Sequence, residues 1–294
     1  MKRLVLLCVA VLTLWTARAE VPGFTWTVGT DLVSTYLWRG LNLGGLSAQP
    51  DVMIGFGGLE LEAWANLGVQ NYDFKNFKTN NAFIPELDLT LGYHIFGLKV
   101  GATHYHYFDG SKYFDLKNYD YNAYRADDYS TDQLEVFLTY DLGEVLENIP
   151  LKFGWYTFVA GDDKYFVDAD GNYVSSDDMQ SVIDDSGYSL KRAFSTYIEL
   201  GYDINLPLGI SLTPTIGMTP WRSQYTFYDG KFAVNNVSLK FNWEYEAGDH
   251  FCLDLYAMAM LNTYGINKNN VFTSFKDMAD QRLNGVIGIG LWFY

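Results

Sequence analysis

The sequence predicts an all-β chain folded as a single transmembrane antiparallel β-barrel of twelve strands. Three features lead to this prediction: an export signal at the N-terminus, two-residue alternation along the chain, and connections that alternate between short and long. The composition agrees with a barrel, because Tyr, Phe and Trp make up 17% of the chain while the mean hydropathy is only −0.06. Many aromatic residues at average hydropathy are typical of strands with one apolar and one polar face.

The first residues have the three parts of a secretory signal peptide. Lys2 and Arg3 are basic, residues 4–14 are apolar, and Ala17-Arg18-Ala19 gives a small-x-small cleavage pattern. We expect residues 1–19 to be a cleaved signal peptide and residues 20–294 to form the barrel, although a signal anchor is the alternative.

Net charge and cysteine content exclude two classes of protein. The chain carries −15 at neutral pH, whereas nucleic-acid binding needs clustered Lys and Arg, so no nucleic-acid partner is expected. Outside the signal peptide Cys252 is the one cysteine, so the fold cannot depend on an internal disulfide.

Alternation with a period of two runs from end to end of the remaining sequence. In residues 59–70, one face is apolar and the other carries most of the polar groups; the apolar face holds Leu59, Leu61, Ala63, Ala65, Leu67 and Val69. Residues 83–93 and 235–245 alternate in the same way. The predicted strands are 24–38, 48–57, 59–70, 83–94, 97–108, 131–141, 150–160, 191–205, 208–219, 233–246, 250–261 and 284–294.

The connections place these strands in an outer membrane. Links after even-numbered strands are short, and the long polar links follow odd-numbered strands, notably 71–82, 109–130, 161–190, 220–232 and 262–283. Short periplasmic turns and long external loops are the topology of outer-membrane barrels. Because lipid cannot satisfy an open sheet edge, we expect the last strand to pair with the first.

Three details of this barrel are predicted from single residues. Tyr36 and Trp38 are expected to end the first strand in an interfacial aromatic girdle. Pro214 lies inside a predicted strand, where it removes a ladder donor, and a bulge is expected there. In the last strand we favour an outward face made of Ile287, Ile289, Leu291 and Phe293, with Trp292 and Tyr294 outward as the alternative.

The string Ser34-Thr35-Tyr36-Leu37-Trp38-Arg39-Gly40-Leu41-Asn42 resembles the first strand and first external turn of the TorF-like porin family. The resemblance covers roughly residues 24–70 and implies an outer-membrane barrel with a channel role. The final Trp292-Phe293-Tyr294 resembles the C-terminal signal that the barrel-assembly machinery reads. The surrounding partners would then be outer-membrane lipid and lipopolysaccharide.

If the apolar faces meet lipid, the charged residues of the strands line the lumen, because charge is costly in lipid. These charges act either as a cation-preferring filter or as a plug of mutual ion pairs. The predicted lumenal set is Asp31, Arg39, Asp51, Glu60, Glu62, Glu86, Asp88, Lys99, Glu135, Asp141, Lys152, Arg192, Glu199, Asp203, Lys240, Glu244 and Asp254.

Two other groups of residues could carry chemistry. Asp168-Ala169-Asp170-Gly171-Asn172 resembles a calcium loop, but the Glu expected at position 179 is Met179, which favours a solvated acidic loop over a metal site. His104 and His106 share the predicted lipid face near the outer rim and would suit a metal or a hydrolase base, but no Gly-x-Ser-x-Gly string accompanies them.

The sequence therefore predicts a passive outer-membrane channel for small solutes or ions, without catalytic residues, metal or cofactor. A closed structural or adhesive barrel, a barrel hydrolase and a periplasmic sandwich remain as alternatives. The sequence does not identify the solute or the oligomeric state.

Overall fold

The computed structural model describes residues 23–68, 72–73, 78–79, 86–107, 114–116, 130–146, 148–174, 189–228, 232–263 and 283–294. The predicted signal peptide lies outside these ranges. Among the residues described, no helix has the length and apolar composition to cross a membrane.

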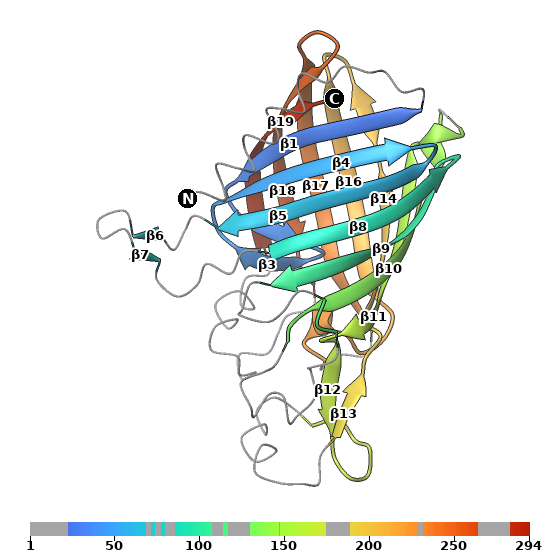
Figure 1. Cartoon of the computed structure of the whole chain (residues 1–294), viewed down its shortest axis with the longest axis vertical. Helices are drawn as coiled ribbons and strands as arrows, with labels where there is room; N and C mark the ends of the chain where they lie inside the picture. Colours follow the sequence, from blue (N-terminus) through green and yellow to red (C-terminus); the bar gives the residue numbers. More distant parts are fainter. Residues whose placement is uncertain are drawn as a thin grey trace.

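A closed antiparallel sheet forms the wall of the molecule (Figure 1). Its strands, in chain order, are β1 (Phe24–Val33), β4 (Ser47–Phe56), β5 (Leu59–Gly68), β8 (Glu86–Ile95), β9 (Leu98–Tyr107), β10 (Gln133–Asp141), β11 (Leu151–Gly161), β14 (Thr196–Tyr202), β15 (Ile204–Leu206), β16 (Ile210–Thr219), β17 (Ala233–Glu246), β18 (Phe251–Leu261) and β19 (Leu283–Phe293). Each strand pairs with its sequence neighbour in the wall, except that β14 and β15 both pair with β16, and β1 pairs with β19 to close the sheet. Because β14 and β15 pair with β16 in one continuous register, they occupy one position, and the wall has the predicted twelve.

Smaller ladders lie outside this wall. β12 (Lys164–Val167) pairs with β13 (Ser189–Arg192) in a hairpin that extends beyond one end of the barrel (Figure 1), and β6 (Tyr72–Asp73) pairs with β7 (Lys78–Thr79). The predicted strand 191–205 is therefore wrong at its start. Its first residues belong to β13, and the wall resumes only at Thr196.

Outward positions of the wall carry exposed apolar side chains. Leu32, Leu61, Leu91 and Ile287 are 49%, 48%, 51% and 69% exposed. An apolar outer band is the surface of a barrel that is surrounded by lipid.

The last strand shows the register of this surface clearly. Its residues alternate between exposed and buried, with Ile287, Ile289 and Leu291 outward. The favoured register is confirmed, and outward Trp292 is wrong. The Trp292 ring lies on the inner side, so close to Gly29 that a β-carbon there would be 2.2 Å from it.

Pro214 is accommodated without the bulge expected at that position. It pairs with Leu239 of β17, and on its other side it faces the short interruption between β14 and β15. A missing ladder donor costs little where the neighbouring strand is itself interrupted. The irregularity of this ladder lies instead between Gly217 and Met218.

The first strand is shorter than predicted. β1 ends at Val33, and the chain then forms β2 (Tyr36–Trp38) and β3 (Leu41–Gly44), which pair only with each other. Tyr36 is 8% exposed and the Trp38 ring contacts buried aromatic rings, so neither residue belongs to an outer girdle. This hairpin positions the candidate site.

Candidate functional site: a hairpin across the lumen

The β2–β3 hairpin turns at Arg39 and Gly40, which both have positive φ angles of 47° and 90°. Two consecutive residues with positive φ give the tight turn favoured in β-hairpins. Gly40 is also required by the far wall, because a β-carbon there would lie 2.0 Å from the carbonyl oxygen of Asn235. The Arg39-Gly40 pair therefore closes the turn and lets its tip touch β17.

Two asparagine side chains hold the tip of the hairpin against the wall. The Nδ2 of Asn235 donates to the carbonyl oxygen of Arg39 at 2.7 Å, and the Nδ2 of Asn262 donates to that of Gly40 at 3.0 Å. Both asparagines are buried. The backbone of the tip is thus satisfied by residues about two hundred positions away.

The Arg39 guanidinium forms the centre of the site. Its Nη1 and Nη2 donate to the two carboxylate oxygens of Glu135 at 2.6 and 2.7 Å, and Nη1 also donates to the Tyr225 hydroxyl at 2.7 Å. It lies 3.9 Å from the centre of the Tyr156 ring and 4.8 Å from that of Trp38. Arginine suits this position because its planar fork bonds a carboxylate in two places while its face stacks on rings.

Aromatic side chains fill the lumen around this ion pair. The Trp38 ring lies 6.0 Å from Tyr105, 6.4 Å from Phe158 and 5.5 Å from Tyr225, measured between ring centres. Tyr105, Phe158, Tyr197 and Tyr225 are the buried apolar cluster of the molecule. The hairpin therefore closes the side of the lumen that faces β9, β10, β11 and β14.

A buried hydrogen-bond network holds Tyr225 in place. Asp163 accepts from the backbone N–H of Ser195 at 2.8 Å and from its hydroxyl at 2.5 Å, and the Ser195 Oγ accepts from the N–H of Gln224 at 2.8 Å. Gln224 begins the short helix η3 (Gln224–Thr226), which carries Tyr225. Burial raises the pKa of Asp163 above its ordinary value, although the Ser195 hydrogen bonds oppose the rise.

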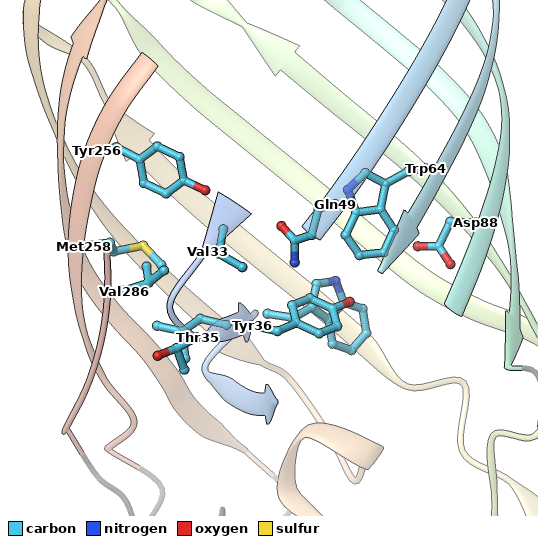
Figure 2. A pocket seen from close by; sticks show the side chains of 11 residues that line it. Val33, Thr35, Tyr36, Gln49, Trp64, Asp88, Tyr256, Met258 and Val286 are labelled. Carbon is cyan, nitrogen blue, oxygen red and sulfur yellow. The ribbon is translucent and has the colours of Figure 1, made fainter. Parts of the chain in front are cut away.

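On the opposite side of the hairpin the lumen opens into a cavity of about 260 Å³. Figure 2 shows Tyr36, Gln49, Trp64 and Asp88 at one end of it and Tyr256 and Met258 at the other. The walls therefore combine aromatic rings, an amide and a carboxylate.

The predicted lumenal cations Lys99, Lys152 and Lys240 have partners inside the barrel, whereas Arg192 lies on β13 outside the wall, where its Nη1 donates to the carbonyl oxygen of Gly161 at 3.2 Å. Lys99 pairs with Glu60 at 2.7 Å, and Lys152 pairs with Asp203 at 2.5 Å and lies 3.7 Å from Asp141. The Lys240 ammonium lies 4.4 Å from the centre of the Tyr256 ring. Together with Arg39 and Glu135, these contacts show that part of the predicted charge set is paired within the barrel.

Most of the remaining predicted carboxylates have no cation in direct contact among the residues that the structure describes. The Glu86 carboxylate accepts hydrogen bonds from the hydroxyl groups of Tyr36 and Tyr107, and the Glu199 carboxylate accepts them from those of Tyr156 and Tyr197. Asp31 accepts from the Tyr256 hydroxyl at 3.3 Å.

Carboxylate oxygens remain unsatisfied on one part of the wall. Asp31, Asp51 and Asp88 each keep one buried oxygen without a hydrogen-bond partner among the described residues. Asp51 lies within hydrogen-bonding reach of the Glu62 carboxyl group. These unsatisfied carboxylate oxygens are thus gathered on β1, β4 and β8, and Asp88 lines the cavity.

One further group of polar side chains lies near the short-turn end of the barrel. The Cys252 Sγ is 3.7 Å from Glu244 and 3.6 Å from Asp254, and the ligand atoms of the three residues lie within 4.8 Å of one another. A thiol and two carboxylates are groups that can ligate a divalent cation.

Sequence reasoning missed the partner of the two histidines. His104 and His106 are on the outward side of β9 as predicted, but they are buried instead of resting in a headgroup layer. Asp132 accounts for this, because its carboxylate lies 3.0 Å from the His104 Nε2 and 2.7 Å from the His106 Nδ1. The Phe114 ring covers His104, with ring centres 4.2 Å apart.

The predicted calcium loop is described only in part. Asp168 accepts from the backbone N–H groups of Asp170 and Asn172 at 3.0 and 2.7 Å, so its carboxylate closes a local turn. Those hydrogen bonds lower the pKa of the exposed Asp168. Residues 175–188, including Met179 and the later aspartates, lie outside the described residues.

Comparisons with known proteins do not place the chain in a family. No family model and no curated protein matches the chain. Among solved structures, the chain is similar to an outer-membrane channel from Pseudomonas putida F1, with 11% identity over 94% of this chain and 96% of that one and a TM-score of 0.41. It is also similar to the Pseudomonas putida toluene transporter TodX, at 10% identity over 93% and 88% with a TM-score of 0.35. Outer membrane phospholipase A from Escherichia coli matches at 10% identity over 92% and 96%, with a TM-score of 0.36.

Proposed function

We propose that this chain is a non-enzymatic outer-membrane channel whose lumen is narrowed by the β2–β3 hairpin. The observation that carries the proposal is the asymmetry of the hairpin's two sides. One side is packed shut around Arg39 and Glu135, and the other opens into a cavity lined by polar and aromatic groups. A structural barrel has no need of a cavity with unsatisfied carboxylates beside it, because each such group destabilises the fold.

The route for solutes follows from this asymmetry. A small solute would pass between the hairpin and the strands β1, β4, β5 and β8, past Tyr36, Trp64 and Asp88. This route is narrow, so it suits ions and small solutes. The aromatic cluster on the other side acts as a fixed wall.

The charge along this route favours cations. Asp31, Asp51 and Asp88 have oxygens without partners, and the nearby cation Lys240 is held over the Tyr256 ring. Carboxylates that line a narrow passage attract cations and repel anions. The ion pairs of Lys99 and Lys152 contribute little to this preference, because each cation lies against a carboxylate.

The C-terminal strand has features that an outer-membrane assembly signal would need. The Phe293 ring packs against Phe251 with ring centres 5.2 Å apart, and the backbone N–H of Tyr294 donates to the carbonyl oxygen of His250. We propose that Trp292, Phe293 and Tyr294 form the signal for the barrel-assembly machinery and that lipopolysaccharide contacts the outer surface.

The test is the current through the refolded chain in a planar bilayer under a potassium chloride gradient. A steady current with a reversal potential on the cation side supports the proposal. The second candidate is a closed barrel, in which the hairpin and aromatic cluster plug the lumen. It predicts silence from protein whose gel migration shows that it is folded.

A further inference from the structure

The seam between β1 and β19 is incomplete on its outer half. The ladder between them runs from Val28 and Phe293 to Val33 and Gly288, and one more step links Ser34 to Ile287. β19 continues to Leu283, but its residues 283–286 pair with β18 alone among the described strands. The wall therefore loses a strand neighbour at this point.

The cause of the gap is the hairpin. After Ser34 the chain turns into the lumen to form β2 and β3 in place of continuing along β19. The hairpin reaches this part of β19 through a side-chain bond, from the Nδ2 of Asn42 to the Oδ1 of Asn284 at 3.1 Å. The turn of the chain that narrows the lumen therefore also leaves the seam between β1 and β19 incomplete.

The outward side chains of β19 are more exposed where β1 no longer lies beside them. Leu283 and Ile287 are 71% and 69% exposed, whereas Ile289 and Leu291, which lie beside β1, are 43% and 37% exposed. All four side chains point outward, so the difference reflects the neighbour and not the face.

A groove of about 500 Å³ lies on the outer surface along this seam. Its walls are almost entirely apolar, and small residues keep it open: Ala257, Ala259 and Gly285 lie at its base, between Leu239, Phe241 and Ile287. Counted from the short-turn end, Ala257 and Ala259 are the seventh and ninth residues of β18. A tilted strand crosses the hydrocarbon layer in about 9–11 residues, so the groove opens into lipid.

The outer groove and the lumenal cavity share two lining residues, Met258 and Val286. Ser34 lines the groove, while Val33 and Thr35 on either side of it line the cavity. Met258 and Val286 are partners in the ladder between β18 and β19, so paired backbone divides the two spaces there. At the seam the two spaces are divided by the turn at Ser34, where the ladder between β1 and β19 ends.

We propose that the seam between β1 and β19 is a lateral opening through which small apolar solutes pass between the lumenal cavity and the surrounding lipid. The turn at Ser34 forms its partition, and the groove at Gly285 is its lipid-facing mouth. The inference rests on the proposed channel function, since the solute must first reach the cavity through the lumen.

The experiment blocks the mouth without touching the lumen. A β-carbon at Gly285 meets only the Met258 carbonyl oxygen at 3.6 Å, an ordinary contact, so Gly285→Phe fills the groove without backbone strain. Uptake of the apolar dye N-phenyl-1-naphthylamine is measured in cells whose outer membrane contains each variant. The matched control is Ala102→Phe, another enlargement of a small residue in the wall, on β9 and away from both spaces.

The expected result is that the original chain speeds dye uptake, Gly285→Phe returns it to the rate of cells without the protein, and Ala102→Phe leaves it unchanged. Val286→Ala enlarges the cavity beside the seam and should raise uptake. If Gly285→Phe does not assemble, Ala259→Phe fills the same groove from β18.

The outcomes separate the two proposals. Uptake through Gly285→Phe equal to that of the original chain overturns the lateral opening, and the groove then holds lipid acyl chains only. Ion current measured on the same proteins tests the channel by itself. Absence of current from the folded original chain would overturn the channel. If Gly285→Phe keeps the current of the original chain but loses dye uptake, the result supports both the channel and the lateral opening.

Discussion

Arg39 and Glu135 are separated by 96 residues, yet the guanidinium bonds both oxygens of the carboxylate, with side chains 11% and 1% exposed. This pair fixes the hairpin across the lumen. A buried pair of this kind owes its importance to what happens when one partner is missing, because the other charge is then buried alone.

Removal of either partner is therefore expected to loosen the hairpin. Arg39→Ala or Glu135→Ala should each destabilise the barrel by about 3–5 kcal/mol, and the double variant by less than the sum of the two. Urea unfolding in detergent micelles measures these values. Additive single effects would contradict a direct coupling between the two residues. Single-channel recordings of the same variants should show larger and noisier currents.

Neutralisation of Asp88 is expected to reduce cation preference. Asp88 lines the cavity and keeps one oxygen unsatisfied, so Asp88→Asn removes charge from the route itself. The reversal potential in a salt gradient should move toward zero, and Asp31→Asn in addition should move it further. Asp168→Asn is the control, since that carboxylate is exposed in a loop outside the barrel wall. An equal shift in the control would mean that overall charge, and not the cavity, sets the preference.

Asp132 is expected to hold the segment at 130–132 against β9. Its carboxylate contacts both His104 and His106, so Asp132→Ala leaves two buried imidazoles without that acceptor. Limited proteolysis should then cut near this segment sooner than in the original chain, while ion current stays the same. A loss of current with unchanged proteolysis would place Asp132 in the conducting route instead.

Stability should depend on pH through Asp163. Burial raises its pKa above the ordinary value of 3.8, so the folded protein binds more protons than the unfolded chain between the two pKa values. The free energy of unfolding should therefore fall as the pH rises from 3.8 through the higher folded value. Asp163→Asn should remove this decrease in urea titrations. Asp168, whose pKa is lowered, contributes a slope of the opposite sign, and Asp168→Asn is the comparison.

The wall could be predicted from the sequence because the two-residue alternation of a strand can be read from neighbouring residues. Alternating faces and the lengths of the connections are enough to place twelve strands and to join the last to the first. The outward register of Ile287, Ile289 and Leu291 followed from the same alternation.

The hairpin could not be predicted in that way. Tyr36 and Trp38 continue the alternation of β1, so the pattern extends the strand past Val33. Its true end is set by distant partners: Glu135, Tyr225 and Asn235 receive Arg39 inside the barrel. The local signal was Gly40, since glycine readily adopts the positive φ that a tight hairpin turn requires.

The burial of His104 and His106 was missed for a similar reason. Asp132 lies 26 and 28 residues away across a long connection, and only the fold brings it to their face of β9. From the sequence alone, a histidine on the outward face of a barrel strand is predicted to lie at the membrane interface, because its partner is not visible.

The most direct test of the central claim is the single-channel current of the refolded chain compared with that of Arg39→Ala, recorded in a potassium chloride gradient. We expect steady, cation-preferring current from the original chain and a larger current when the hairpin loses its anchor. Silence from both folded proteins would contradict the channel. A current that Arg39→Ala leaves unchanged would show that the hairpin does not limit the passage.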